Sequence, residues 1–151
     1  MQNDINEFEQ IINEMKENEI VQKMKNYRQH YDTSCYEHCL NVSHISYKIC
    51  KKLKWDYVAV ARASMVHDLF LYDWRKREDE RKGLHGFTHP KTSLENAKKV
   101  FKLSKREEDI ILKHMWPLTV KIPRYKESWV VIWVDKYCAI KESINYYFSK
   151  K

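Results

Sequence analysis

The sequence predicts an all-α fold with short connections between its helices. Only two glycines and three prolines occur among 151 residues, whereas sheets and barrels need turn residues in larger numbers. Apolar residues recur every three or four positions along most of the chain, which is the spacing of one helix face. The length of 151 residues predicts a single domain over residues 1–151 that is large enough to bury a core.

The charge of the chain narrows the classes of partner. Lysine and arginine total 28 and aspartate and glutamate total 21, so the formal net charge is +7. This excess favours anionic partners such as phosphate esters, nucleotides or nucleic acid, although a solvated basic surface has the same composition. No apolar run approaches the roughly 20 residues of a membrane span, and the first residues lack the pattern of a signal peptide. We therefore expect a cytoplasmic protein without a membrane partner.

The four cysteines are expected to be free thiols in a reducing compartment. Two of them stand one helical turn apart, but no second Cys or His pair at zinc-finger spacing follows them. A structural zinc site at this pair is therefore the minor interpretation. The four residues are Cys35, Cys39, Cys50 and Cys138.

The N-terminal third is predicted to hold two helices, over about 3–25 and 33–54, with a charged connection over 26–32. An interruption of the first helix at Asn18-Glu19 is the alternative to a continuous one. The second helix carries a histidine, His38, on its predicted buried face. His44 lies well round the helix from that face. We therefore expect it either at the surface or in contact with a ligand residue, without binding the metal itself. Three polar residues can cap this helix, namely Asp32, Thr33 and Ser34. The predicted buried face consists of His38, Val42, Ile45 and Ile49.

The next predicted helix, over 56–70 with Asp56 as its cap, ends unusually. Residues 61–65 are mostly apolar or small, which predicts a buried segment, and His67-Asp68 follows directly. A buried carboxylate must be paired or bound to a metal, since an unpaired one costs several kcal/mol or takes up a proton. The neighbouring histidine favours the metal.

A run of charged residues follows over 72–86. Most such runs are solvated loops or exposed helix faces. Because this one comes directly after the candidate ligands, a phosphate-binding cation or a mobile lid is an equal alternative. The candidate cations are Arg75 and Arg77.

The C-terminal half is predicted to hold three more helices, over about 91–101, 105–115 and 127–148. Pro90 is expected in the first turn of the first of these, which fixes His89 at the helix entrance. Ser104 and Glu107 form a capping box for the second. The third begins with an apolar run that leads into Asp135.

Six residues of metal-ligand type thus stand on apolar faces or at helix ends. Each alone has an ordinary structural explanation, but six together are hard to explain as coincidence. Imidazoles with two carboxylates suit Fe, Mn, Zn, Co or Ni, whereas a magnesium site would not need four histidines. The six are His38, His67, Asp68, His89, His114 and Asp135.

Three segments, 36–42, 63–68 and 131–136, resemble the H…HD…D signature of the HD-domain superfamily of metal-dependent phosphohydrolases. The resemblance covers about residues 33–142, with an N-terminal helix and connection over 1–32 and a helix end over 143–151. It implies a bundle of five to eight helices around a central metal site. It implies that one ion is held by His38, His67, Asp68 and Asp135, that Asp68 bridges, and that His89 and His114 hold a second ion.

The activity implied by this resemblance is hydrolysis of an anionic phosphate ester or nucleotide by a metal-activated hydroxide, with Asp68 at the catalytic centre. Lys91, Arg75 or Arg77 would stabilise charge in the transition state, although a solvated surface charge is the alternative for each. Residues 69–72 lack the Ile-Gly-Lys of the cyclic-dinucleotide phosphodiesterase branch. Two rival functions remain: a di-iron oxygenase on an HD-like scaffold, and a basic helical module that binds nucleic acid, which would not need the ligand set.

Overall fold

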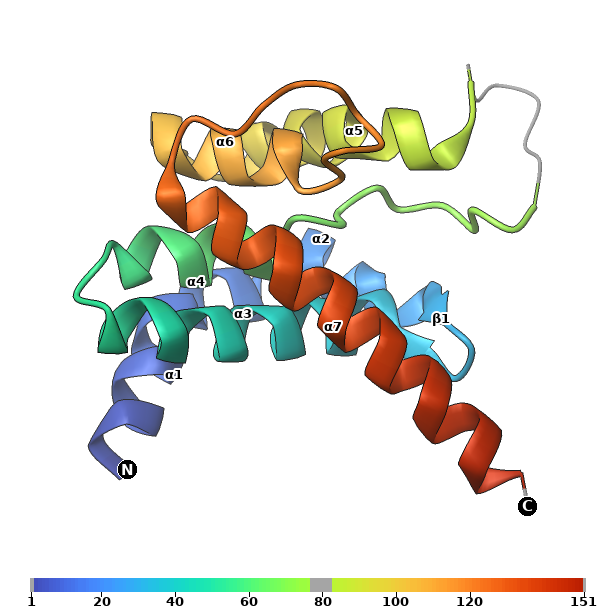
Figure 1. Ribbon diagram of the computed structural model, residues 1–151, viewed down its shortest axis with the longest axis horizontal. Helices are drawn as coiled ribbons and strands as arrows, with labels where there is room; N and C mark the ends of the chain where they lie inside the picture. The colour runs from blue at the N-terminus through green and yellow to red at the C-terminus, as the bar shows by residue number, and fades with distance from the viewer. Residues whose placement is uncertain (1, 77–82, 151) are drawn as a thin grey trace.

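The computed structural model describes residues 2–76 and 83–150, and nearly all of the regular structure in them is helical (Figure 1). The all-α prediction is therefore confirmed. In chain order the elements are α1 (Gln2–Glu17), α2 (Glu19–Gln22), the 3-10 helix η1 (Lys23–Asn26), β1 (Arg28–His30), β2 (Thr33–Ser34), α3 (Cys35–Lys52), α4 (Tyr57–Met65), α5 (His85–Val100), α6 (Lys105–Lys113) and α7 (Lys126–Ser149).

Helices α3, α4 and α7 form the centre of the bundle. α3 packs against both α4 and α7, and α4 also contacts α1 and α6. α5 and α6 lie side by side in a second layer, and α7 runs obliquely past both layers (Figure 1). No helix in the described part of the chain is long and apolar enough to cross a bilayer. The core between these helices includes Ile12, Met15, Val42, Val60, Met65, Ile110 and Val131, all fully buried.

The predicted helix caps are present. Ser34 caps α3 in a capping box with Glu37, and Ser104 and Glu107 form the same box at α6. Asp56 caps α4, where its Oδ1 accepts a hydrogen bond of 3.0 Å from the backbone N–H of Ala59. These caps fix where the helices begin, and so fix the register of the ligand residues that follow.

The N-terminal third takes the alternative of an interrupted first helix, and its connection differs from the prediction. The predicted helix over 3–25 is divided at Asn18, whose side chain caps α2 by accepting from the N–H of Ile20 at 2.9 Å. The predicted connection over 26–32 contains strand β1 of a short antiparallel hairpin with β2. Tyr31, at the turn, has φ 51°, a left-handed conformation that few non-glycine residues adopt. The hairpin was not predicted because the charged residues of this segment are typical of a solvated connection.

The buried face of α3 is also different from the predicted one. His38 and Val42 are fully buried, but Ile49 is 38% exposed. The buried face instead consists largely of cysteine and serine residues. Their burial is hard to predict from a hydropathy pattern, because these residues are less apolar than leucine or isoleucine. This face includes Cys35, Cys39, Val42, Ser46 and Cys50.

Several boundaries of the last four helices differ from the prediction. α4 ends at Met65 and not at residue 70, so His67 and Asp68 lie in tight turns after it. α5 begins at His85 and not at residue 91, so Pro90 lies inside the helix. α6 ends at Lys113, two residues early, and α7 spans one residue more at each end than predicted. The early start of α5 was not predicted because Gly86 and Pro90 are residues that usually interrupt or begin a helix.

Candidate metal centre

Three elements bring four of the predicted ligands to one point. His38 comes from the second turn of α3, His67 and Asp68 from the turns after α4, and Asp135 from the middle of α7. One potential ligand atom from each of the four lies within 4.8 Å of the others. His38 Nε2 is 2.8 Å from Asp135 Oδ1, and His67 Nε2 is 3.3 Å from Asp68 Oδ2 and 3.5 Å from Asp135 Oδ1. The predicted convergence of these helices is confirmed.

A second group adjoins the first and shares Asp68 with it. His89 from α5 and His114, the C-cap of α6, place their Nε2 atoms 3.2 and 3.3 Å from Asp68 Oδ1. The two Nε2 atoms are 2.9 Å apart, which is about the separation of two adjacent ligands with metal–nitrogen bonds of about 2.0–2.1 Å. Asp68 thus turns Oδ2 toward the first group and Oδ1 toward the second.

All four histidines are oriented in the same way by a hydrogen bond at the other ring nitrogen. The Nδ1–H of His67 donates to Ser64 O at 2.6 Å, that of His89 to His85 O at 2.8 Å and that of His114 to Ile111 O at 2.7 Å. His38 Nδ1–H donates to the Glu142 carboxylate at 3.0 Å. An acceptor at Nδ1 fixes the tautomer with the proton there, which leaves the Nε2 lone pair facing the centre.

The bond from His67 to Ser64 also explains where α4 ends. The backbone N–H of His67 approaches the same Ser64 carbonyl at 3.4 Å, and the N–H of Val66 bonds to Ala63 O. These three-residue turns replace the four-residue bonds of a continued α-helix. The turn therefore gives both His67 and Asp68 access to the centre, although they are adjacent in sequence.

The centre is buried and polarised to hold a positive charge. Burial lowers the pKa of His38, but its hydrogen bonds to Asp135 and Glu142 outweigh this effect and raise that pKa to about 10. The pKa of His67 is also raised, against burial, by Cys39 and Asp68. Although burial opposes ionisation of Asp68 and Asp135, the surrounding imidazoles hold the pKa of each carboxyl below its usual value. The two carboxylates thus concentrate negative charge at a buried point, which a bound cation would neutralise.

The chemistry of the donor set fits a metal ion. His67 Nε2 and Asp68 Oδ1 are buried without a hydrogen-bond partner, and leaving such atoms unpaired costs about 1–3 kcal/mol each or more. Both atoms belong to the ligand groups, and both point where a cation would satisfy them. Imidazole nitrogens with carboxylate oxygens are the ligands of divalent transition metals.

A cavity of about 250 Å³ opens onto the centre. Ligand residues form its floor, so a small molecule in the cavity reaches the candidate metal positions directly. The residues of its walls come from the hairpin, from the segment before α5 and from α7; they include Gln29, His30, Trp74, His85 and Lys136.

The predicted phosphate-binding cations are not brought to this cavity in the described part of the chain. Lys91 has a side chain that is 77% exposed, pairs with Glu95 and lines a different groove. Arg75 pairs with Asp73 at 3.1 Å and is absent from the cavity walls. Arg77 lies outside the described residues. The structure thus gives neither Lys91 nor Arg75 a place at the centre.

Three residues at the centre were not predicted. Gln29 Nε2 donates to Asp68 Oδ2 at 2.6 Å, Glu142 holds His38, and Lys136 lines the cavity. Glu142 follows Asp135 by two helical turns and so shares its face, a signal that was available in the sequence. Lys136 directly follows Asp135. Gln29 comes from the unpredicted hairpin and carried no such signal.

The remaining predicted features belong to neither of the two ligand groups. His44 packs against Phe8 with ring centroids 5.0 Å apart, about 120° round α3 from His38. His85, the alternative to His89, stacks on His89 at 4.3 Å and accepts the His89 Nδ1–H through its backbone carbonyl. All four cysteines are buried free thiols, and no candidate ligand group among the described residues includes a cysteine.

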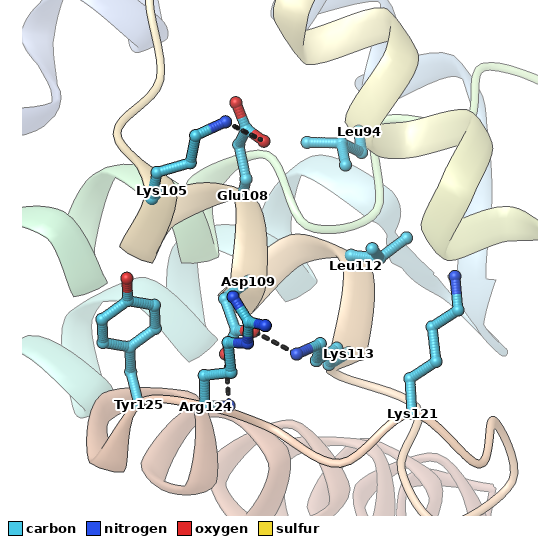
Figure 2. A pocket seen from close by; sticks show the side chains of 9 residues that line it. All are labelled: Leu94, Lys105, Glu108, Asp109, Leu112, Lys113, Lys121, Arg124 and Tyr125. Carbon is cyan, nitrogen blue, oxygen red and sulfur yellow. Dashed lines mark hydrogen bonds and ion pairs between the residues drawn. The ribbon is translucent and has the colours of Figure 1, made fainter.

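A second hollow, of about 380 Å³, lies beside α6 and contains none of the predicted ligands (Figure 2). Its carboxylates are already paired. Asp109 binds Lys113 and accepts hydrogen bonds from the N–H of Arg124 and from Ser128 Oγ, and Glu108 pairs with Lys105. These contacts connect α6 to the start of α7, so this hollow is a structural junction and not a competing metal site.

Comparisons with known proteins bear on the same residues. The HD domain family matches residues 35–140 of the chain, which include all six predicted ligands. Comparisons with curated proteins and with solved structures gave no match. The family match covers more than half of the sequence, and the buried His and Asp groups able to hold a metal lie within it. The chain therefore belongs to the HD domain family, within the superfamily of metal-dependent phosphohydrolases.

Proposed function

We propose that this protein is a metal-dependent phosphohydrolase that cleaves a phosphate ester or nucleotide. One observation carries the proposal: two buried ligand groups share Asp68, and hydrogen bonds at Nδ1 turn all four imidazole Nε2 atoms toward its two carboxylate oxygens. A structural role alone would not require four oriented imidazoles around two carboxylates beneath an open cavity.

The donor set supports one or two divalent transition-metal ions among Fe, Mn, Ni, Co and Zn. His38, His67, Asp68 and Asp135 would hold the first ion, and His89 and His114 the second, with Asp68 between them. When bound, such ions lower the pKa of a water ligand toward ~7 and neutralise the oxygens of a phosphate.

The residues of the chain around the ions position both the ligands and the substrate. Gln29 donates to Asp68 Oδ2 and fixes the plane of that carboxylate, so that each oxygen keeps its direction. Lys136 supplies a positive charge in the cavity wall, where its ammonium group donates to Trp116 O at 3.1 Å. Burial lowers the pKa of Lys136, and Asp135 opposes this shift. We assign Lys136 to binding a phosphate oxygen of the substrate.

The size of the cavity bears on the substrate. At about 250 Å³ it lies below the roughly 300–1,000 Å³ of sites that enclose a drug-sized ligand. This supports a small phosphate ester enclosed at the centre, with any larger group, such as a nucleoside, extending out of the cavity.

The proposal is tested by removing metal with a chelator and restoring Mn, Fe, Co, Ni or Zn separately. We expect the metal-free protein to release no phosphate from a panel of monoesters, diesters and nucleotides, and at least one metal to restore release. Absence of hydrolysis with every metal would contradict the proposal. Oxygen consumption with iron bound, without phosphate release, would favour the di-iron oxygenase, and metal-independent binding of nucleic acid would favour the basic module.

Glu142 is expected to support metal binding through His38. Replacing Glu142 with Ala removes the acceptor that holds the His38 Nδ1–H, and losing such a partner costs about 10–100-fold in metal affinity or activity. Glu142→Gln keeps an acceptor oxygen and should lose less. Calorimetric titration of the metal-free protein with Mn measures both variants. Equal affinity in wild type and Glu142→Ala would show that this hydrogen bond does not support the ligand.

A further inference from the structure

The outer face of α7 carries an exposed apolar stripe that the metal centre does not use. Its five residues are large, and each is between 49% and 62% exposed. They recur at intervals of four, three, four and three residues, which is the spacing of a coiled-coil seam. The stripe consists of Trp133, Tyr137, Ile140, Ile144 and Tyr147.

The stripe faces away from the candidate ligands. At roughly 100° of rotation per residue, Asp135, Ala139 and Glu142 share the face of α7 that lines or supports the centre. Ile140 and Ile144 lie on the opposite face. The C-terminal part of α7 also projects beyond the other helices (Figure 1). One side of this helix thus serves the centre, while the other carries the stripe. At its C-terminal end, Tyr147 also shares a hydrogen bond of 3.0 Å with the Tyr31 hydroxyl of the hairpin.

The spacing of the stripe is nearly symmetric about Ile140. Relative to that residue, the other four stand at −7, −3, +4 and +7. A two-fold axis near Ile140 would therefore pair the stripe with itself in antiparallel orientation. Trp133 would meet Tyr147 of the second copy, and Ile140 would meet its own equivalent. A self-complementary patch of this kind is what an isologous dimer needs.

The area is close to what a stable dimer buries. An aromatic side chain buries about 150–250 Å², so a residue that is half exposed offers roughly 100 Å². The stripe and Phe148, which is 71% exposed, together offer roughly 600 Å². A standard interface buries about 800 Å² on each partner, and the side chains that flank the stripe can supply the remainder.

We propose that this stripe is the interface of an antiparallel homodimer. The pairing packs a second copy of α7 against the back of the helix that supplies Asp135 and Glu142. It does not require metal or substrate, so it stands apart from the proposed hydrolase activity.

The flanking charges give the proposal a distinctive salt dependence. Lys141 and Lys150 border the stripe, whereas the Lys136 ammonium is directed to Trp116 O. The one carboxylate between residues 137 and 149, Glu142, points inward to His38. Pairing two copies brings lysines near lysines, and salt screens that repulsion. Dimerisation should therefore strengthen as salt rises. An acidic protein helix or an anionic membrane on the same stripe would bind more weakly at high salt.

Sedimentation of the full chain over a range of protein and salt concentrations tests the proposal. We expect a dimer that tightens with salt. The double variant Ile140→Ser with Ile144→Ser should raise the dissociation constant of the dimer by more than about 100-fold. Each substitution is present in both copies, so the interface loses four isoleucine side chains. Ile122→Ser is the matched control, since Ile122 is 67% exposed but lies outside α7. Circular dichroism checks that each variant folds.

Three outcomes would overturn the homodimer. The first is a wild-type chain that remains monomeric under all conditions. The second is a dimer that the double variant leaves unchanged. The third is a monomer that binds vesicles of anionic and neutral phospholipid through the stripe, with binding lost in the double variant and weakened by salt.

Discussion

Replacing Asp68 with Ala is expected to abolish hydrolysis and metal binding together, with turnover falling by more than about 100-fold. Asp68 is 2% exposed and contributes one oxygen to each of the two ligand groups. Its loss removes negative charge from both candidate positions at once and leaves two cations to repel each other. Phosphate release and Mn binding, measured on the same preparation with saturating Mn, give the result.

His44→Ala is the matched control, because it removes an imidazole from α3 that packs on Phe8 and not on the centre. Both activity and metal binding should stay close to wild type. Asp68→Asn provides a second variant of nearly equal volume, so that a loss of function can be separated from a loss of folding. Retention of most activity in Asp68→Ala or Asp68→Asn would contradict the assignment at its centre. Loss of activity in His44→Ala would mean that the faces of α3 are assigned wrongly.

Replacing both His89 and His114 with Ala is expected to reduce metal stoichiometry from two ions per chain to one. These two residues and Asp68 Oδ1 make up the second group, while the first keeps His38, His67, Asp68 and Asp135. The remaining ion should stay bound because none of its other ligands is touched. Activity should fall by at least about 100-fold, since a single ion cannot clamp both sides of the transferred phosphate.

Metal analysis after equilibrium dialysis measures this stoichiometry. His85→Ala is the control, because His85 lines the cavity and stacks on His89 but belongs to neither group. It should retain two ions per chain. A wild-type protein that binds one ion, with no change in the double variant, would contradict the second position.

The helices and most of the ligand set were predictable from local sequence. Ser34, Asp56 and Ser104 cap the helices that the capping patterns predicted. His67 and Asp68 drew attention because a carboxylate seldom occurs in an apolar run without a partner. His38 and Asp135 stand on helix faces, where periodicity alone assigns them to the interior.

The features that local sequence did not predict depend largely on contacts between segments or on side-chain hydrogen bonds. Gln29 donates a hydrogen bond to Asp68 from a hairpin, and the charged residues of this segment predicted a loop instead. α4 ends early because the His67 Nδ1–H donates a hydrogen bond to the backbone carbonyl of Ser64, a contact that helix propensity does not describe. Lys91 stands two residues after His89, and helix residues two apart point about 200° apart. Lys91 therefore faces a different groove, while Lys136, one residue from Asp135, lines the cavity wall.

The most direct test of the metal centre is anomalous X-ray diffraction from crystals grown with Mn, recorded above and below the metal absorption edge. We expect a peak among His38 Nε2, His67 Nε2, Asp68 Oδ2 and Asp135 Oδ1, and a second peak beside His89 Nε2 and His114 Nε2 on the other side of Asp68. Mn found only at surface carboxylates, with no peak at the buried cluster, would contradict it.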